Sequence, residues 1–259
     1  MPLSLSAKTI KVAVVDTGFD FNSNWSKVDL KFVGLSVPKL CPTGHKNYTS
    51  EENIDTHGHG THIAGLIAAH ADFADYCLVI YKYYEKDATG EQNLNRTINA
   101  FSDAVAEGVD IINYSGGGII RSEAECSILK KALDKGIKVI AAAGNEGLNL
   151  NRFKFYPALC DPRITVVEAQ DKAGKRLGIS NYSSDSKNAV KTVKRLGLNV
   201  MSVLPNNQIG YMTGTSQSTA IVAGETVKRL YNIRNLDDLW LPNILKSANR
   251  MLASEVQCK

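Results

Sequence analysis

Residues that could carry out acyl-transfer chemistry stand at the ends of several apolar runs in this 259-residue sequence. Asp16 follows the run IKVAVV, His59 begins a helical pattern after a polar stretch, and Ser216 begins another such pattern near the C-terminus. A serine hydroxyl is a weak nucleophile at neutral pH, so it needs an imidazole to take its proton and a carboxylate to orient that imidazole. The three residue types together therefore indicate nucleophilic catalysis at a carbonyl group.

Glycine-rich segments follow two other apolar runs. They are SGGG at 115–118 and AGNEG at 143–147. Glycines let a backbone approach a substrate closely, but each segment alone is also explained by a turn or a helix cap. The first segment lacks the lysine that a phosphate-binding loop requires. Only the combination of these segments with the acid, the histidine and the serine favours a catalytic site.

The elements that must position these residues follow from the hydrophobic pattern. It predicts strands at 10–16, 78–84, 109–114, 137–143 and 164–168, and helices at 59–71, 94–107, 122–135, 216–231 and 241–251. Near-continuous apolar strands separated by helices are typical of a parallel sheet covered on both faces. We therefore predict one α/β domain over residues 1–259, with a mostly parallel central sheet between two helix layers. In such sheets ligands bind at the carboxyl ends of the strands, where these motifs lie.

Composition and charge exclude several classes of protein. Hydrophobic residues make up 44% and charged residues 22%, which is too apolar for a disordered chain. The net charge of +4 comes without a long basic run, so nothing indicates a nucleic-acid partner; the densest basic stretch, at 187–195, is expected to be a solvated face or a loop. No apolar run approaches the length of about 18 residues that a membrane helix requires.

Cysteine usage and the N-terminal residues bear on location. The five cysteines are scattered and form no C-x-x-C pair, so we expect free thiols in a reducing compartment. The first eight residues lack the pattern of a secretory signal, and no stretch resembles a propeptide. Both observations favour a cytoplasmic location.

The ordered set of motifs resembles that of the subtilisin-family (subtilase) serine proteases. The motifs are DTG (16–18), HGTHIAG (59–65), SGGG (115–118), AAAGNEG (141–147) and GTS…VAG (214–224). Their order of acid, histidine and serine is that of the family. The resemblance extends over residues 10–224 and implies a three-layer fold and a serine endopeptidase that needs no metal or cofactor. It also implies a peptide or protein substrate, no nucleic-acid or membrane partner, and a monomer by default.

The resemblance implies a role for each motif residue. Asp16 would orient the imidazole, His59 would act as general base and then general acid, and Ser216 would attack the substrate carbonyl. The side-chain amide of Asn145 and the backbone N–H of Ser216 would stabilise the oxyanion. An extended peptide would lie between two backbone segments. These segments are Ser115, Gly116 and Gly117 on one side and Ala142, Ala143 and Gly144 on the other.

The sequence departs from the family pattern in three places. Gln217 stands where relatives carry methionine after the serine, so the packing behind the nucleophile is expected to differ. Residues 70–77 leave no room for the calcium-binding loop of many relatives, so we predict no calcium there. Tyr156-Pro157 resembles a pair whose peptide bond is often cis. The preceding Phe155 is then predicted to narrow the main specificity pocket and to favour a small side chain before the scissile bond.

Two other classes of function compete for the same residues. His57, His59 and His62 form H-x-H-x-x-H and could ligate zinc in a metallohydrolase, although a zinc site would leave Ser216 and Asn145 unexplained. The chain could also be an inactive peptide-binding module of the same fold. Within the protease reading, His62 is expected to be a structural residue and His57 to be exposed.

Overall fold

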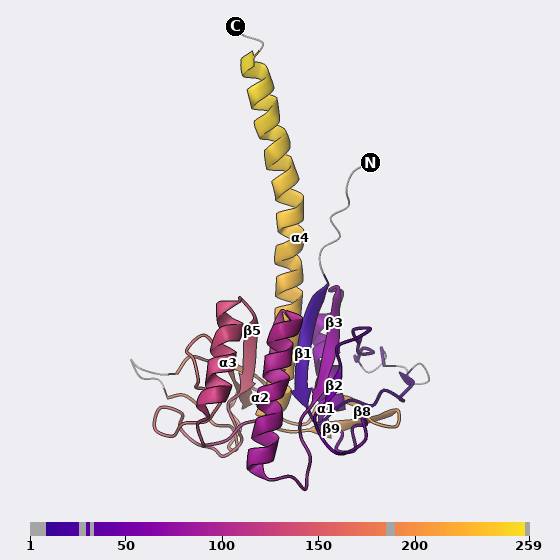
Figure 1. The fold of residues 1–259 in the computed structure, drawn as a ribbon, viewed down its shortest axis with the longest axis vertical. Coiled ribbons are helices and arrows are strands. Elements are labelled where there is room, and N and C mark those ends of the chain that lie inside the picture. The colour runs from indigo at the N-terminus through magenta and orange to yellow at the C-terminus, as the bar shows by residue number, and fades with distance from the viewer. Residues whose placement is uncertain (1–8, 26–29, 32–33, 185–189, 257–259) are drawn as a thin grey trace.

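A seven-stranded parallel sheet forms the centre of the computed structural model (Figure 1). The structure describes residues 9–25, 30–31, 34–184 and 190–256, with side chains described as far as residue 235. The sheet order is β2-β3-β1-β4-β5-β6-β7, and all its pairs are parallel. Its strands are β1 (Ile10–Asp16), β2 (Lys46–Asn47), β3 (Tyr76–Lys82), β4 (Ile111–Tyr114), β5 (Lys138–Ala142), β6 (Thr165–Gln170) and β7 (Thr192–Leu196).

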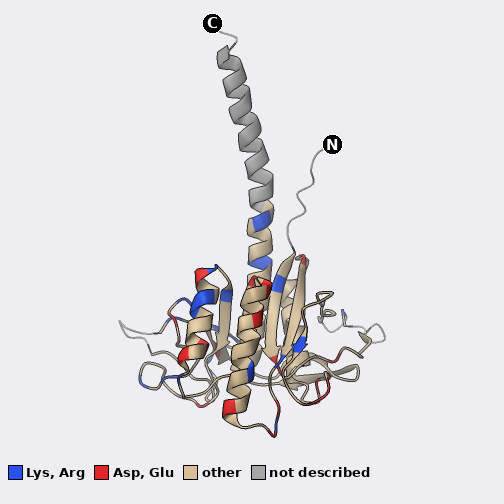
Figure 2. Ribbon diagram, viewed as in Figure 1, with Lys and Arg blue, Asp and Glu red and all other residues tan. Residues whose placement is uncertain are grey.

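Helices cover both faces of this sheet. They are α1 (His59–Ala71), α2 (Gly90–Glu107), α3 (Glu123–Asp134) and α4 (Thr215–Val256). Alternate residues of β1 point to opposite faces, so Val12 and Val14 join the core cluster under α1 and α4, whereas Ala13 and Val15 join the cluster under α2 and α3. The predicted fold of a mostly parallel sheet between two helix layers is confirmed. Charges of both signs are spread over α2 and α3 (Figure 2).

The first residue of α2 differs from that predicted because the helix begins at a cap, while its last residue agrees. Thr89 accepts a hydrogen bond from the backbone N–H of Gln92, and the Gln92 side chain accepts one from the backbone N–H of Thr89. This reciprocal pair satisfies two N–H groups that would otherwise lack partners at the helix start. The helix therefore starts at Gly90, earlier than the apolar pattern indicates, and ends at Glu107 before Gly108, whose φ is 67°.

An antiparallel hairpin that the pattern did not predict packs against α1. It consists of β8 (Val200–Leu204) and β9 (Gln208–Met212). Asn206 and Asn207 at its turn have φ values of 60° and 59°, a conformation that asparagine tolerates better than most residues. Ser202 in β8 donates to the carbonyl oxygen of His62 in α1 at 2.8 Å. The hairpin thus fixes the helix that carries His59.

One prediction about the second half of the chain needs correction, and another agrees with the structure. The predicted helices at 216–231 and 241–251 form one helix, α4. The C-terminal part of α4 extends beyond the sheet (Figure 1). In the basic stretch at 187–195, Lys194 and Arg195 belong to the edge strand β7 and are 51% and 39% exposed, which agrees with the predicted solvated face. Arg195 also pairs with Glu225 of α4 at 2.8 Å, and Lys187 lies outside the described residues. Within the described part of the chain, no helix is both long and apolar enough to span a membrane.

The prediction of free thiols is wrong for four cysteines. Cys41 is bonded to Cys77, and Cys126 is bonded to Cys160. The first pair forms because the backbone around Leu40 runs beside β3, which brings positions far apart in the sequence together. Disulfides persist in oxidising compartments, so the cysteines no longer support a reducing one. Cys258 lies outside the described residues.

Candidate active site

The carboxyl end of β1 meets the first residue of α1. Asp16, the last residue of β1, accepts a hydrogen bond from His59 Nδ1 at an N–O distance of 2.6 Å. The close contact between the segment after β1 and the start of α1 requires glycine at position 60, since a Cβ there would lie 2.1 Å from the carbonyl oxygen of Gly18. Asp16 is 4% exposed, so this hydrogen bond is shielded from bulk water. The two residues are thus held as an acid that orients an imidazole.

The surroundings of His59 favour its charged form. Burial alone would lower the pKa of His59, but the charge of Asp16, its hydrogen bond and the charge of Asp55 outweigh burial and raise the pKa above its ordinary value. The imidazolium that forms when His59 accepts a proton is therefore stabilised. This property suits a general base that must carry a positive charge during the reaction.

Asp55 organises the start of α1, a role that the pattern did not indicate. One carboxylate oxygen accepts from the Thr17 hydroxyl and the Gly58 N–H, each at 2.8 Å. The other accepts from the backbone N–H and the hydroxyl of Thr61 at 2.8 and 2.7 Å. Both oxygens are thereby used, and Asp55 links the β1 end to α1.

Ser216 lies in the first turn of α4, against the segment that follows β4. Its hydroxyl donates to the carbonyl oxygen of Ser115 at 3.1 Å, and the side chain is 7% exposed. Among the described residues, no hydrogen bond joins this hydroxyl to His59. The following residue, Gln217, is 2% exposed, and its amide nitrogen has no partner within the described chain. A buried amide nitrogen without a partner thus lies behind the serine.

Asn145 presents its amide nitrogen beside the start of α4. Its side-chain oxygen accepts from the backbone N–H of Thr215 at 2.9 Å and from the Thr215 hydroxyl at 3.1 Å. Because only the oxygen of the amide can accept these bonds, the NH₂ group faces the opposite way. The side chain is exposed, so this group is available to a ligand in the cleft.

The two predicted wall segments differ in their free hydrogen-bonding groups. The carbonyl oxygens of Ala143 and Gly144 accept bonds from Asn181 at 2.9 and 3.0 Å, and Ala142 lies within β5. Within the described residues, the backbone groups of Gly116 and Gly117 have no such partners, while Gly118 pairs with Tyr156. Unpaired backbone groups therefore lie at Gly116 and Gly117, next to Ser115, whose carbonyl oxygen accepts from the Ser216 hydroxyl.

The Phe155 ring lies between the two segments. A Cβ on Gly117 would be 2.4 Å from one edge of the ring, and a Cβ on Gly144 would be 2.9 Å from the other edge. Phe155 is 5% exposed, and the Tyr156-Pro157 peptide bond that follows it is cis, as predicted. The space between the walls is therefore narrowed by an aromatic side chain.

Of the three neighbouring histidines, His57 and His59 have ring centroids 6.1 Å apart in a T-shaped arrangement. The His62 ring is fully buried and donates from Nε2 to the carbonyl oxygen of Val200 at 3.0 Å, and burial lowers the pKa of His62 to about 4. His57 is exposed, and its ring centroid lies 5.8 Å from that of Tyr84. No cluster of three or more metal-ligating side chains occurs in the described chain. The expected structural place of His62 and the exposure of His57 agree with this arrangement.

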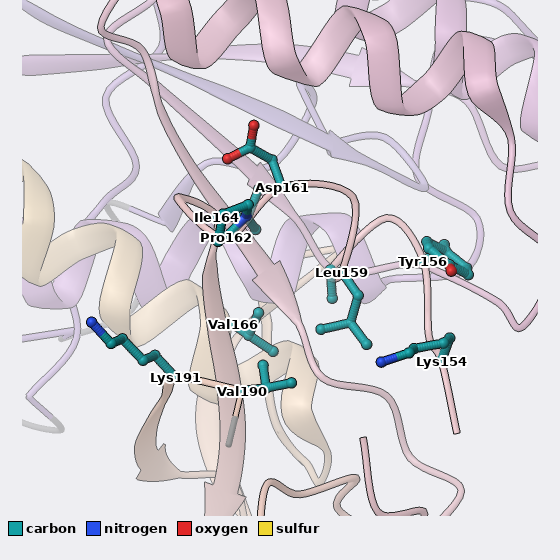
Figure 3. Close-up of a pocket in the computed structure, with 10 residues that line it drawn as sticks. Lys154, Tyr156, Leu159, Asp161, Pro162, Ile164, Val166, Val190 and Lys191 are labelled. Atoms are coloured by element: carbon teal, nitrogen blue, oxygen red, sulfur yellow. The ribbon is translucent and has the colours of Figure 1, made fainter. Parts of the chain in front are cut away.

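A cavity of about 410 Å³ lies apart from these residues (Figure 3). Apolar side chains of Leu159, Ile164, Val166 and Val190 line it, with Lys154 and Lys191 at its edge. It contains no nucleophile paired with a base.

Comparison with curated proteins finds bacterial subtilisins. A subtilisin of Bacillus pumilus is 34% identical over 228 residues, which cover 85% of this chain and 76% of the relative. Subtilisin E of Bacillus subtilis is 33% identical over 228 residues, which cover 85% of this chain and 55% of the relative. The chain thus spans about half the length of several of these relatives.

Comparison with solved structures and family models agrees with this result. The epidermin leader peptide processing serine protease of Staphylococcus aureus superposes with a TM-score of 0.69 at 21% identity, covering 89% of this chain and 67% of that one. At this identity the likeness concerns the fold. The model of the subtilase family matches residues 7–240. The chain therefore belongs to the subtilase family of serine endopeptidases.

Proposed function

We propose that this protein hydrolyses peptide bonds with Asp16, His59 and Ser216 as its catalytic triad. The observation that carries the proposal is the 2.6 Å hydrogen bond from His59 Nδ1 to Asp16. It leaves His59 Nε2 as the basic nitrogen, at the same edge of the sheet as the α4 turn that holds Ser216. A base oriented by a carboxylate beside a serine is the arrangement that acyl transfer requires.

The reaction proceeds in two halves. The Ser216 oxygen attacks the substrate carbonyl carbon while its proton passes to His59 Nε2, and the carbonyl oxygen becomes an oxyanion. Collapse of this intermediate breaks the C–N bond, and His59 gives the proton to the departing amine. Water then attacks the acyl-enzyme by the same route, which releases the acid and restores Ser216. Asp16 stays ionised throughout and stabilises the imidazolium.

Two donors support the oxyanion. One is the NH₂ group of Asn145, held in place because its oxygen accepts both bonds from Thr215. The other is the backbone N–H of Ser216, in the first turn of α4, where N–H groups lack intrahelical acceptors and the helix dipole favours negative charge. Donors fixed before the reaction stabilise the developing charge without reorganisation.

The free and substrate-bound enzymes use the Ser115 carbonyl oxygen differently. In the free structure this oxygen accepts from the Ser216 hydroxyl at 3.1 Å. A peptide that pairs with Ser115, Gly116 and Gly117 donates a backbone N–H to the same oxygen. The serine hydroxyl is then released and turns to His59, so substrate binding completes the triad. Catalytic hydrogen bonds often tighten only in this way.

Covalent labelling distinguishes the proposal from its alternatives. Phenylmethylsulfonyl fluoride should sulfonylate Ser216 and abolish hydrolysis of a quenched peptide library, whereas a chelator should leave hydrolysis unchanged. Ser216→Ala should remove both labelling and hydrolysis, while Ser102→Ala, at an exposed site on α2, should remove neither. Loss of activity with chelator alone would identify a metallohydrolase. A folded protein that is neither labelled nor active would be a binding module.

A further inference from the structure

Glu125 in the first turn of α3 is a buried carboxyl group. Its side chain is 3% exposed. Its backbone N–H donates a hydrogen bond to the hydroxyl of Ser122, the residue that caps the helix. Burial raises the pKa of Glu125 to about 7. No lysine, arginine or histidine of the described chain forms an ion pair with it. By contrast Glu123, two residues earlier, is 77% exposed and pairs with Arg121 at 2.6 Å.

The charge of this carboxyl acts on two buried tyrosine hydroxyls. Tyr83, after β3, and Tyr114, the last residue of β4, are hydrogen-bonded to each other, and Tyr114 also bonds Thr97 of α2. Burial first, and then the neighbouring charges including Glu125, raise the pKa of both phenols, so they stay neutral. The two hydroxyls thus lie between the charges of two acids, Asp16, which is paired with His59, and Glu125, which has no cation partner among the described residues.

The pair of tyrosine hydroxyls lies directly behind the segment 115–117. A Cβ on Gly116 would be 2.4 Å from the Tyr83 hydroxyl oxygen and 2.7 Å from that of Tyr114. The face to which residue 116 would point is therefore the face of the hydroxyl pair. The next residue, Gly117, points to Phe155, as expected for alternation along an extended segment.

In a substrate strand paired with this wall, the side chains alternate between the same two faces. Residues directly opposite each other on paired strands place their side chains on the same face, with Cβ atoms about 4.5–5.5 Å apart. The substrate residue opposite Gly116 therefore projects toward Tyr83, Tyr114 and Glu125, and so do residues two positions away. Its neighbours project toward Phe155 or away from the protein.

We propose that Glu125, with the hydroxyls of Tyr83 and Tyr114, forms a subsite for a lysine or arginine side chain of the peptide substrate. This inference rests on the proposed function, because it needs a peptide paired with residues 115–117. The aliphatic stem of such a side chain packs along the tyrosine rings, and its charged end supplies the cation that Glu125 lacks. A buried carboxylate and an entering cation form a charge-assisted hydrogen bond, while a neutral side chain leaves the acid uncompensated.

A lysine scan tests the subsite. Quenched peptides of one sequence carry lysine or norleucine, in turn, at each of the four positions on either side of the scissile bond. We expect kcat/KM to favour lysine by about 10- to 100-fold at one position, or at two alternate positions, the range of a hydrogen bond to a charged group. Glu125→Gln should bring that ratio close to one. Glu123→Gln, an exposed control on the same helix turn, should keep it.

The outcomes separate this inference from the proposed function. A wild-type enzyme that cleaves the peptides but prefers lysine at no position overturns the subsite, and so does a preference that survives in Glu125→Gln. Should that variant not fold, the wild-type scan decides alone. If no peptide is cleaved, the proposed function fails instead. Fluorescence anisotropy of labelled lysine and norleucine peptides with Ser216→Ala then measures the preference without catalysis, and equal affinities overturn the subsite.

Discussion

Replacing Phe155 by alanine should change which residue is accepted before the scissile bond. The ring spans the space between Gly117 and Gly144, with distances of 2.4 and 2.9 Å from a Cβ on either one. A side chain that enters between the two walls must therefore be small. We expect the wild-type enzyme to prefer glycine, alanine or serine at this position and to reject phenylalanine.

The size of the effect follows from the apolar surface involved. Full burial of a phenylalanine side chain is worth about 1.5–3 kcal/mol, which corresponds to about 10- to 150-fold in kcat/KM. Phe155→Ala should therefore raise the ratio of kcat/KM for phenylalanine over alanine peptides by that factor. The ring is 5% exposed, so its removal also destabilises the fold by about 3–5 kcal/mol, or about 6–20 °C in Tm.

The assay compares two quenched peptides that differ only in the residue before the scissile bond, well below the Tm of the variant. Phe153→Ala is the matched control, since this ring lies in the same loop but is 54% exposed. It should leave the ratio unchanged. A wild-type preference for large aromatic residues would refute the reasoning, as would an unchanged ratio in a folded Phe155→Ala enzyme.

Two further predictions concern the base and the disulfides. Since the Asp16 charge raises the pKa of His59 and only neutral His59 acts as base, kcat/KM should fall as the pH drops through a midpoint above the ordinary histidine value of 6.5. Asp16→Asn should move that midpoint down and lower kcat by about 10⁴-fold, as in a chymotrypsin-like triad; an unmoved midpoint would contradict the ion pair. The Cys41–Cys77 and Cys126–Cys160 bonds close loops of 36 and 34 residues, so each should add about 4 kcal/mol of stability. Thermal melting with and without dithiothreitol measures this, and equal Tm values would contradict it.

The apolar strands of the sheet could be predicted because burial on both faces leaves a clear record in the sequence. The predicted strand at 10–16 agrees with β1 at both ends, and the predicted helix at 59–71 agrees with α1. Strands at the edge of the sheet have a weaker apolar pattern in the sequence. β7 reads TVKRL, and its charged residues suit an exposed edge but not an apolar pattern. The hairpin turn at Asn206-Asn207 was the available signal for β8 and β9, and it was missed.

The sequence indicated which residues could form the site but not how their neighbours hold them. The motif order predicted that Asp16 and His59 would be related, and their side chains are in contact. It did not indicate that Asp55 accepts four hydrogen bonds, because an acid before a helix reads equally well as a cap. The sequence pattern also did not indicate the disulfides, since Cys41 and Cys77 are adjacent only in the folded sheet.

The selectivity proposed for the cleft depends on two adjacent glycines that the sequence shows only as a glycine-rich run. Position 116 faces the Tyr83 and Tyr114 hydroxyls, and position 117 faces Phe155, so one short wall would present a polar face and an apolar face in alternation. The sequence did not indicate the polar face, because Ser122 and Glu125 are spaced as in a capping box. In that motif the acid side chain accepts a hydrogen bond from the backbone at the helix start. In the structure the Glu125 side chain is buried, and Ser122 accepts a hydrogen bond from its backbone N–H. A substrate read by this wall would need a small residue on one face and a cation on the other, a requirement stricter than either face imposes alone.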